Sequence, residues 1–232
     1  MINMEGKHVL VITPHPDDAE SGAGGTIAKW SKQGASITLV VCTNGNKGTS
    51  DREISSKEIA AIRRVEQLEA AEVLGIQNVV FLDHPDQGLT DNDEFRKELV
   101  TQIRENKPDI VLTIDPERKW IRHRDHYMTG RVALDAIFPY ARDYLAYPDL
   151  IEAGLQPHKV LKIFLWGTDE PDTYIDIDES FQTKIDALYC HSSQMSSSKE
   201  EGYTRLSKRF SEHGPKVDSE LAEPFKLITV RG

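Results

Sequence analysis

Two clusters of histidine and aspartate are the parts of this 232-residue chain best suited to chemistry. The first is Pro14-His15-Pro16-Asp17-Asp18-Ala19-Glu20, and the second is His123-Arg124-Asp125-His126. Catalytic zinc takes three protein ligands, usually imidazole and carboxylate, and keeps one position open for water. His15, Asp18 and His126 would supply two imidazoles and one carboxylate, so they are the candidate metal ligands.

The other acidic and imidazole groups of the two clusters have candidate roles in proton transfer. A bound zinc ion can lower the pKa of its water towards ~7, and Asp17 is the candidate base for that water. Asp125 could hold a histidine through the second nitrogen of its ring. His123 could donate to the substrate oxygen or the leaving nitrogen, because imidazole titrates near neutral pH.

Each cluster taken alone also fits a structural role. Asp17 could simply cap a following helix, and an isolated stretch like 123–126 could be a solvated loop. Two such clusters at the strand ends of one sheet are harder to explain in that way. Their joint presence therefore favours a metal site.

The rest of the chain alternates short apolar runs with helical patterns. We expect strands at 8–13, 37–42, 79–82 and 109–113, with weaker ones at 160–166 and 174–177 as a hairpin. We expect helices at 25–32, 54–74 with Gly75 as C-cap, 95–104, 127–138 and 179–190. This alternation predicts an α/β fold, a Rossmann-like three-layer sandwich with a mostly parallel sheet. Such sheets bind ligands beyond the carboxyl ends of their strands, where both clusters lie.

The pattern weakens toward the end of the chain. We expect one domain over 1–232, with a core at about 1–190 and a small C-terminal extension. The stretch 191–232 is polar, which indicates surface structure or a mobile flap, with a strand at 225–230.

Composition excludes several classes of function. The net charge of −10, from 28 basic and 38 acidic residues, argues against nucleic-acid binding. No apolar run approaches the ~18–20 residues of a membrane span. The first residues lack the layout of a secretory signal, and Cys42 and Cys190 are read as buried thiols, so we expect a cytoplasmic protein.

Other site types fit the motifs less well. A dinucleotide fingerprint at Gly22-Ala23-Gly24-Gly25 would need a glycine at position 27, where Ile27 stands, so these glycines are expected to allow close helix–sheet packing. The chain has neither a P-loop nor a nucleophile elbow. A metallophosphatase usually uses two metals and more carboxylates. A closed structural metal site has four ligands, often cysteine, and no cysteine lies in either cluster.

The two clusters, together with Gly22-Ala23-Gly24-Gly25-Thr26, resemble the motifs of the LmbE-like, or PIG-L, zinc-dependent N-deacetylases. Weaker similarities are Arg63-Arg64-Val65-Glu66, Leu74-Gly75, Asp86-Gln87-Gly88-Leu89 and His191-Ser192-Ser193-Gln194. The family includes the N-acetylglucosaminyl-phosphatidylinositol deacetylases and the deacetylases of mycothiol and bacillithiol synthesis.

The resemblance implies a role for each site residue. His15, Asp18 and His126 would bind zinc, and Asp17 would be the general base. His123 would act as acid or electrostatic stabiliser, oriented by Asp125.

The resemblance further implies that Arg63 and Asp86 contact sugar hydroxyls. Alternatively, Arg63 only pairs with Glu66 or an aspartate on a helix surface, and Asp86 only shapes a turn with Gly88.

The expected reaction is hydrolysis of the N-acetyl group of an N-acetylglucosamine-type sugar or glycoside, with release of acetate. The alternatives are an amidase acting on another N-acyl metabolite or thiol conjugate, and a non-catalytic metal-binding protein. Fe²⁺ or another divalent ion also suits two histidines and one carboxylate. The resemblance implies a homo-oligomer, a trimer or hexamer.

Overall fold

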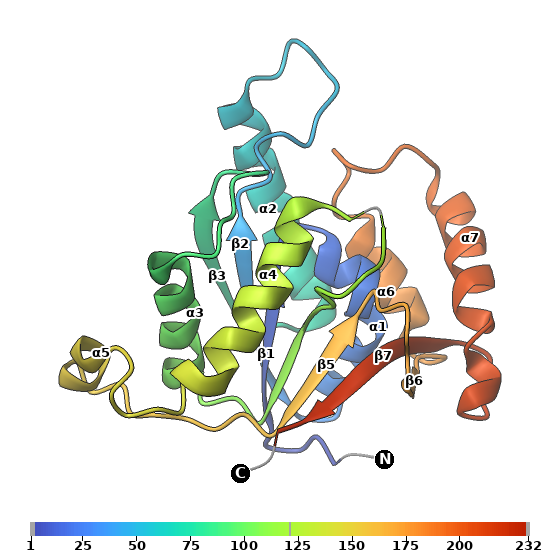
Figure 1. Ribbon diagram of the computed structural model, residues 1–232. Helices are drawn as coiled ribbons and strands as arrows, with labels where there is room; N and C mark the ends of the chain where they lie inside the picture. Colours follow the sequence, from blue (N-terminus) through green and yellow to red (C-terminus); the bar gives the residue numbers. More distant parts are fainter. Residues whose placement is uncertain (1–2, 121, 231–232) are drawn as a thin grey trace.

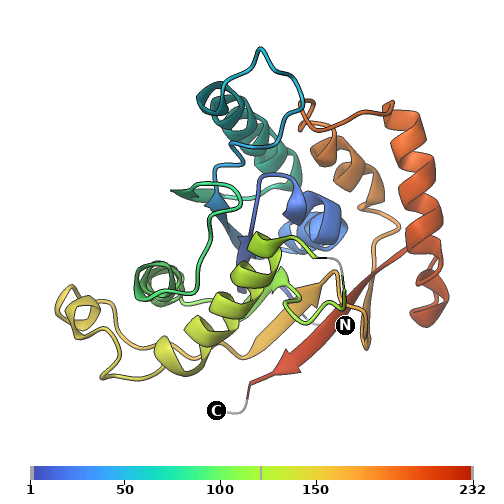
Figure 2. The same ribbon diagram turned by 45° about the horizontal axis from the view of Figure 1, so that its top comes forward.

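The computed structural model describes residues 3–120 and 122–230, which form one seven-stranded sheet with helices on both faces (Figure 1, Figure 2). The strands are β1 (His8–Thr13), β2 (Ser36–Thr43), β3 (Asn78–His84), β4 (Ile110–Ile114), β5 (Lys162–Trp166), β6 (Thr173–Asp176) and β7 (Ala222–Thr229). Their order in the sheet is β3-β2-β1-β4-β5-β7-β6. The first five are parallel neighbours, and β7 runs antiparallel to both β5 and β6. The predicted α/β fold with a mostly parallel sheet is confirmed.

The helices cover the sheet in two layers. They are α1 (Asp18–Lys32), α2 (Ser56–Leu74), α3 (Asp93–Asn106), α4 (Arg124–Asp135), α5 (Pro148–Glu152), α6 (Phe181–Leu188) and α7 (Lys199–Ser211), with short turns η1 (Ala136–Tyr140) and η2 (Gly214–Lys216). Val9 and Val11 of β1 share a core with residues of α1, α2 and α6. Leu10 and Ile12 point the other way and share a core with residues of α3 and α4. The alternation of side chains along a buried strand therefore produces the two helical layers.

The ends of α2 follow its sequence signals. Ser55 and Glu58 form a capping box at the start of the helix. Gly75 ends it in the left-handed conformation with φ 71°, as the C-cap prediction required. The glycines of α1 also fit their prediction, because a Cβ at Gly22 would overlap the indole of Trp166 in β5.

Helix α1 begins earlier than expected. Its first residue is Asp18, not a residue near 25, so a predicted metal ligand lies in its first turn. The start of this helix was predicted too late because the glycines at 22–25 follow its first turn, and glycine disfavours helix on average.

The C-terminal stretch differs most from its prediction. The described residues 191–230, expected as a flap or extension with a strand at 225–230, supply α7 and β7, so the predicted strand is confirmed. Strand β7 lies between β5 and β6, so the predicted hairpin of 160–166 with 174–177 is wrong. Strand β7 comes from a segment about 50 residues further along the chain than its neighbours β5 and β6. Local sequence patterns do not predict such long-range strand pairing. None of the helices within residues 3–120 and 122–230 is both long and apolar enough to cross a bilayer.

Candidate metal centre

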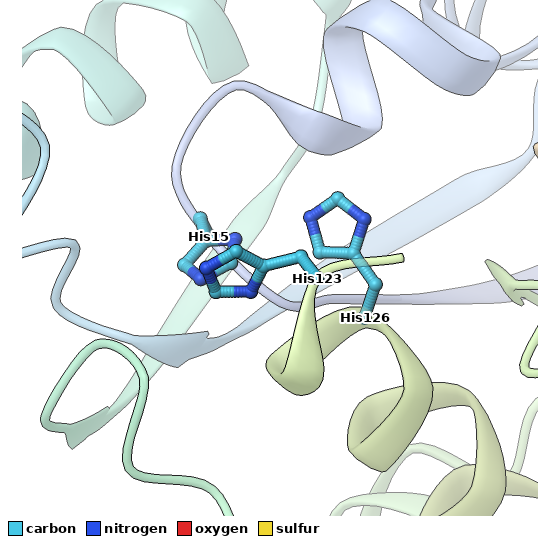
Figure 3. Close-up of side chains that lie close together, drawn as sticks. All are labelled: His15, His123 and His126. Carbon is cyan, nitrogen blue, oxygen red and sulfur yellow. The ribbon is translucent and has the colours of Figure 1, made fainter. Parts of the chain in front are cut away.

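Two loops at the carboxyl edge of the sheet bring the two predicted clusters together. Strand β1 ends at Thr13 just before the first cluster, and the chain that follows β4 carries the second. Since β1 and β4 are parallel neighbours, both loops leave the same edge. Figure 3 shows the rings of His15, His123 and His126 close together; the centroid of His15 lies 4.6 Å from that of His123 and 5.2 Å from that of His126.

Asp18 contacts both predicted imidazole ligands on the Nδ1 side of His15, and ligand atoms of His15, His123 and His126 lie within 4.8 Å of one another. Oδ2 of Asp18 lies 2.9 Å from Nδ1 of His15 and 3.1 Å from Nε2 of His126. The same carboxylate oxygen accepts the backbone N–H of His15 at 3.1 Å, which fixes the loop before α1. Asp18 and His126 are both partly exposed, so solvent reaches this side of the cluster.

The Nε2 side of His15 faces two further carboxylates. Nε2 lies 3.1 Å from Oδ1 of Asp86 and 3.2 Å from Oδ2 of Asp125. The fully buried Asp125 carboxylate also accepts the backbone N–H groups of Gln87 and Leu89 at 2.6 and 3.2 Å. Ligand atoms of His15, Asp86, His123 and Asp125 lie within 4.8 Å of one another, so this side is a second possible cation site.

The electrostatics of the cluster require a positive charge. Burial opposes a charged His15, but the carboxylates of Asp125, Asp18 and Asp86 outweigh it and raise the pKa of His15 to about 11. Burial also opposes a charged Asp18, yet His126 and His15 lower the pKa of its carboxyl. Without a metal, the cluster therefore retains a proton. A divalent cation would supply the same positive charge, and imidazole and carboxylate are suitable ligands for it.

Asp17 lies beside the ligands and is not a helix cap. It occupies the N-cap position of α1, but its side chain makes no capping hydrogen bond, so the capping alternative is wrong. Its backbone is in the left-handed region, with φ 97°. Burial and the neighbouring Asp18 carboxylate raise the pKa of Asp17 to about 7 despite the nearby Arg63. A carboxylate in this range is suited to accept and return a proton near neutral pH.

Arg63 is buried behind Asp17. Its Nη2 donates to Oδ2 of Asp17 at 3.2 Å and to the carbonyl oxygen of Pro16 at 2.6 Å, while Nη1 donates to the carbonyl oxygen of Gly45. The alternative of a surface pair with Glu66 is wrong, because only 4 % of Arg63 is exposed. Arg63 therefore links Asp17 and the adjoining Pro16 to the segment that follows β2.

Asp86 is also drawn into the cluster. The backbone around it does form a turn, in which the Gly88 N–H donates to the carbonyl oxygen of Pro85. Its buried carboxylate nevertheless faces Nε2 of His15 at 3.1 Å and Nε2 of His123 at 3.9 Å, so shaping the turn is not its only role.

The relation between His123 and Asp125 differs from the one that the family resemblance implies. The Asp125 carboxylate contacts His15 and the two backbone N–H groups, not the ring of His123. The link between the two residues is the backbone N–H of Asp125, which donates to Nδ1 of His123 at 3.2 Å. This geometry follows from the place of His123 at the N-cap of α4, where its ring turns back on the first turn of the helix.

A cavity of about 310 Å³ adjoins the ligands. Asp18 and His126 form part of its wall, and Trp166, Arg118, Arg209 and His213 are among its other lining residues. A larger cavity of about 450 Å³ lies between the end of α1 and β6, and none of the predicted site residues lines it. The smaller cavity is therefore the candidate substrate pocket.

Behind Asp17 lies a chain of buried polar residues for which the sequence patterns predicted no role in the site. It consists of Glu20, Gln67 and His191, all fully buried. Gln67 lies one helical turn after Arg63 and Glu20 one turn after Asp17, so the i, i+4 and i, i+3 spacings were the available signal.

Comparison with known proteins gives consistent relatives. A family model described as PIG-L, GlcNAc-PI de-N-acetylase, matches residues 10–137. The chain is 38% identical over 188 residues to the diacetylchitobiose deacetylase of Thermococcus kodakarensis, covering 81% of this chain and 70% of that protein. It is 29% identical to a probable N-acetyl-alpha-D-glucosaminyl L-malate deacetylase 2 of Bacillus cereus, covering 88% and 90%. The structure of N,N'-diacetylchitobiose deacetylase from Pyrococcus horikoshii, complexed with its inhibitor MPG, superposes with a TM-score of 0.90 at 33% identity, covering 96% of this chain and 84% of that one.

Proposed function

The chain belongs to the PIG-L family of de-N-acetylases, and from this premise we propose that it hydrolyses the N-acetyl group of an N-acetylglucosamine-type sugar or glycoside to a free amine and acetate. The relatives are named as deacetylases of such sugars. The observation that carries the proposal is the contact of the Asp18 carboxylate with both His15 and His126, next to the partly exposed Asp17.

We assign the metal to the Nδ1 side of His15, with Asp18 and His126. On the Nε2 side, Asp125 is already committed to two backbone N–H groups, and a carboxylate on the far nitrogen is the usual support of a metal-binding histidine. A divalent ion held there, zinc in our proposal, would supply Lewis acidity that polarises the acetamide carbonyl and makes water a better nucleophile. Fe²⁺ would suit the same ligands.

Asp17 acts as the general base. Its carboxylate takes a proton from the attacking water and later passes a proton to the departing nitrogen, so that water and the amide become acetate and an amine. The donor Nη2 of Arg63 fixes the carboxylate in place at 3.2 Å.

His123 stabilises negative charge on the carbonyl oxygen. Because its Nδ1 accepts the N–H of Asp125, a neutral ring carries its proton on Nε2, the nitrogen nearer Asp86. Burial, followed by the charge of His15, lowers the pKa of His123, which favours this neutral form. A fixed N–H donor aimed at a developing oxyanion is commonly worth ~10²–10³ in rate.

The sugar would occupy the cavity beside Asp18 and His126. Asp86 and Arg63 stay proposed contacts of the sugar hydroxyls, although neither lines this cavity, and we propose that Arg63 also supports Asp17. Arg118 and Arg209 line the same cavity, which favours a substrate with an anionic substituent as the second candidate.

A panel of N-acetylated sugars, assayed for released acetate and free amine, tests the proposal. It should contain diacetylchitobiose and an anionic N-acetylglucosaminyl glycoside, because these separate the two candidate substrate classes. We expect turnover that Asp17→Asn lowers by at least ~10²–10³. Full activity of Asp17→Asn on the best substrate would refute the assigned base, and no turnover of any acetamido sugar would refute the function.

Three further expectations stay predictions: one domain over 1–232, a cytoplasmic location, and assembly into trimers or hexamers. Light scattering coupled to size-exclusion chromatography tests the assembly directly.

A further inference from the structure

We propose that Glu20, Gln67 and His191 are positioning residues, which hold the general base Asp17 in place from behind through a buried chain of polar contacts. The proposal rests on the proposed function, because it concerns the base of that reaction. It goes beyond the metal ligands and Asp17, and it links the catalytic edge to the C-terminal half of the chain.

Asp17 needs such support because its backbone is strained. A φ of 97° is disfavoured for any residue with a side chain, and it persists only where surrounding contacts impose it. The backbone N–H of Asp17 donates to Oε1 of Gln67 at 3.3 Å. Together with Arg63 on the carboxylate, this contact holds both the main chain and the side chain of the base.

Glu20 determines which way the Gln67 amide points. Nε2 of Gln67 donates to Oε1 of Glu20 at 2.7 Å, and an ionised carboxylate can only accept. The amide oxygen of Gln67 is therefore the end left for the Asp17 N–H. Since Glu20 and Gln67 are both fully buried, water does not compete for either contact.

His191 completes the chain on the far side of Glu20. Its Nε2 faces Oε2 of Glu20 at 3.6 Å, and the ring is fully buried. Among the described residues, neither nitrogen of this ring nor Oε2 of Glu20 has a hydrogen-bond partner. Buried polar groups without a hydrogen-bond partner lower the free energy of unfolding. Apolar side chains at these positions would therefore serve a purely structural role better.

Separate contacts anchor the segment that carries His191. Helix α6 packs beside α1 and α2 (Figure 1), and Lys184 of α6 donates to the carbonyl oxygens of Glu20 and Ser21. Ser193 donates its N–H and its hydroxyl to the Glu66 carboxylate, both at 2.7 Å. These anchors do not touch Gln67, so they offer a control for the positioning chain.

The first test compares steady-state kinetics of Gln67→Leu and Ser193→Ala. We expect Gln67→Leu to lower kcat by ~10–100-fold with KM and bound metal unchanged, because the base is misplaced while the ligands remain. Ser193→Ala should stay within about twofold of the wild type, since the exposed Ser193 anchors the His191 segment without touching Gln67 or Asp17. Equal losses in both variants, or a Gln67→Leu effect confined to KM, would overturn the proposal.

The second test uses conservative replacement within the chain. Glu20→Gln keeps an oxygen that can accept from Gln67, whereas Glu20→Leu does not. We expect Glu20→Gln to retain at least ~10-fold more kcat than Glu20→Leu at equal metal content. Similar kcat values for the two would overturn the assigned role of Glu20.

The third test separates positioning from general structural damage. In an Asp17→Asn background the base is gone, so Gln67→Leu should cost little further activity. An additive loss would overturn the positioning role while leaving the deacetylase function intact. Undiminished activity of Asp17→Asn alone would instead refute the assigned base.

Discussion

Two buried polar clusters meet on the same helix, α1, and they differ in how completely their charges are paired. In the first, Nζ of Lys184 donates to Glu20 O, Ser21 O and Oε1 of Glu223 at 2.9, 2.8 and 2.7 Å. The Glu223 carboxylate also accepts the backbone N–H groups of Gly25 and Thr26. Every proton of the ammonium is used, so this cluster is closed.

The second cluster, around His15, is open. Oδ2 of Asp18 faces Nε2 of His126 at 3.1 Å, and both side chains remain partly exposed. Paired buried charges therefore hold the fold, whereas a partly exposed group of carboxylates and imidazoles offers ligand atoms to a metal ion.

The largest expected effect tests the open cluster. Asp18→Asn should lose stoichiometric metal and lower kcat by at least ~10³, because it removes the carboxylate charge that faces both imidazoles. Metal analysis and acetate release measure the two losses. Glu179→Gln, on the exposed surface, is the control and should change neither. If Asp18→Asn retained its metal, the assignment of the His15 cluster as the metal site would be wrong.

The closed cluster should show the opposite pattern. Lys184→Met leaves the Glu223 charge buried without its partner, so the free energy of unfolding should fall by about 3–5 kcal/mol. Urea denaturation measures this loss, and the folded fraction should still bind metal. Adding Glu223→Gln should recover part of the stability; a loss below ~1 kcal/mol in the single variant would contradict a structural role.

Metal removal should affect the two regions unequally. After chelation we expect activity to vanish and to return with zinc, while circular dichroism keeps its folded signal, because the two apolar cores do not depend on the ligands. Free zinc at ~100 times its Kd should raise the free energy of unfolding by about 2.7 kcal/mol. Unfolding on chelation would indicate a closed structural site instead.

The smallest effect concerns an ordinary, partly exposed pair used as a reference. The hydrogen bond that the His84 ring donates to the Glu98 carboxylate, against the effect of burial, raises the pKa of His84. The pair therefore stabilises the fold below the unfolded pKa of ~6.5 and loses this effect as the pH rises through the raised value. Glu98→Gln should lower the free energy of unfolding by less than ~1 kcal/mol at pH 6, and by less still at pH 9. Equal differences at both pH values would contradict the assignment.

The sequence predicted those strands and site residues whose positions depend on local residue patterns. Apolar runs located β1 to β4, and the strand ends located both ligand clusters, because parallel strands align their carboxyl ends at one edge. It did not predict the partner of the Asp125 carboxylate, since the choice between His15 and His123 depends on how α4 packs against β1. The placement of β7 was also out of reach, because Glu223 meets Lys184 only after the whole chain has folded.

The most direct test of the metal site that we assign to His15, Asp18 and His126 is the position of the bound ion. Crystals of the zinc-loaded protein, measured at the zinc absorption edge, would show the ion as an anomalous peak. We predict a peak at about 2.0–2.2 Å from Nδ1 of His15, Oδ2 of Asp18 and Nε2 of His126. A peak on the other side of the ring, bound by Nε2 of His15 with Asp86 and Asp125, would contradict it.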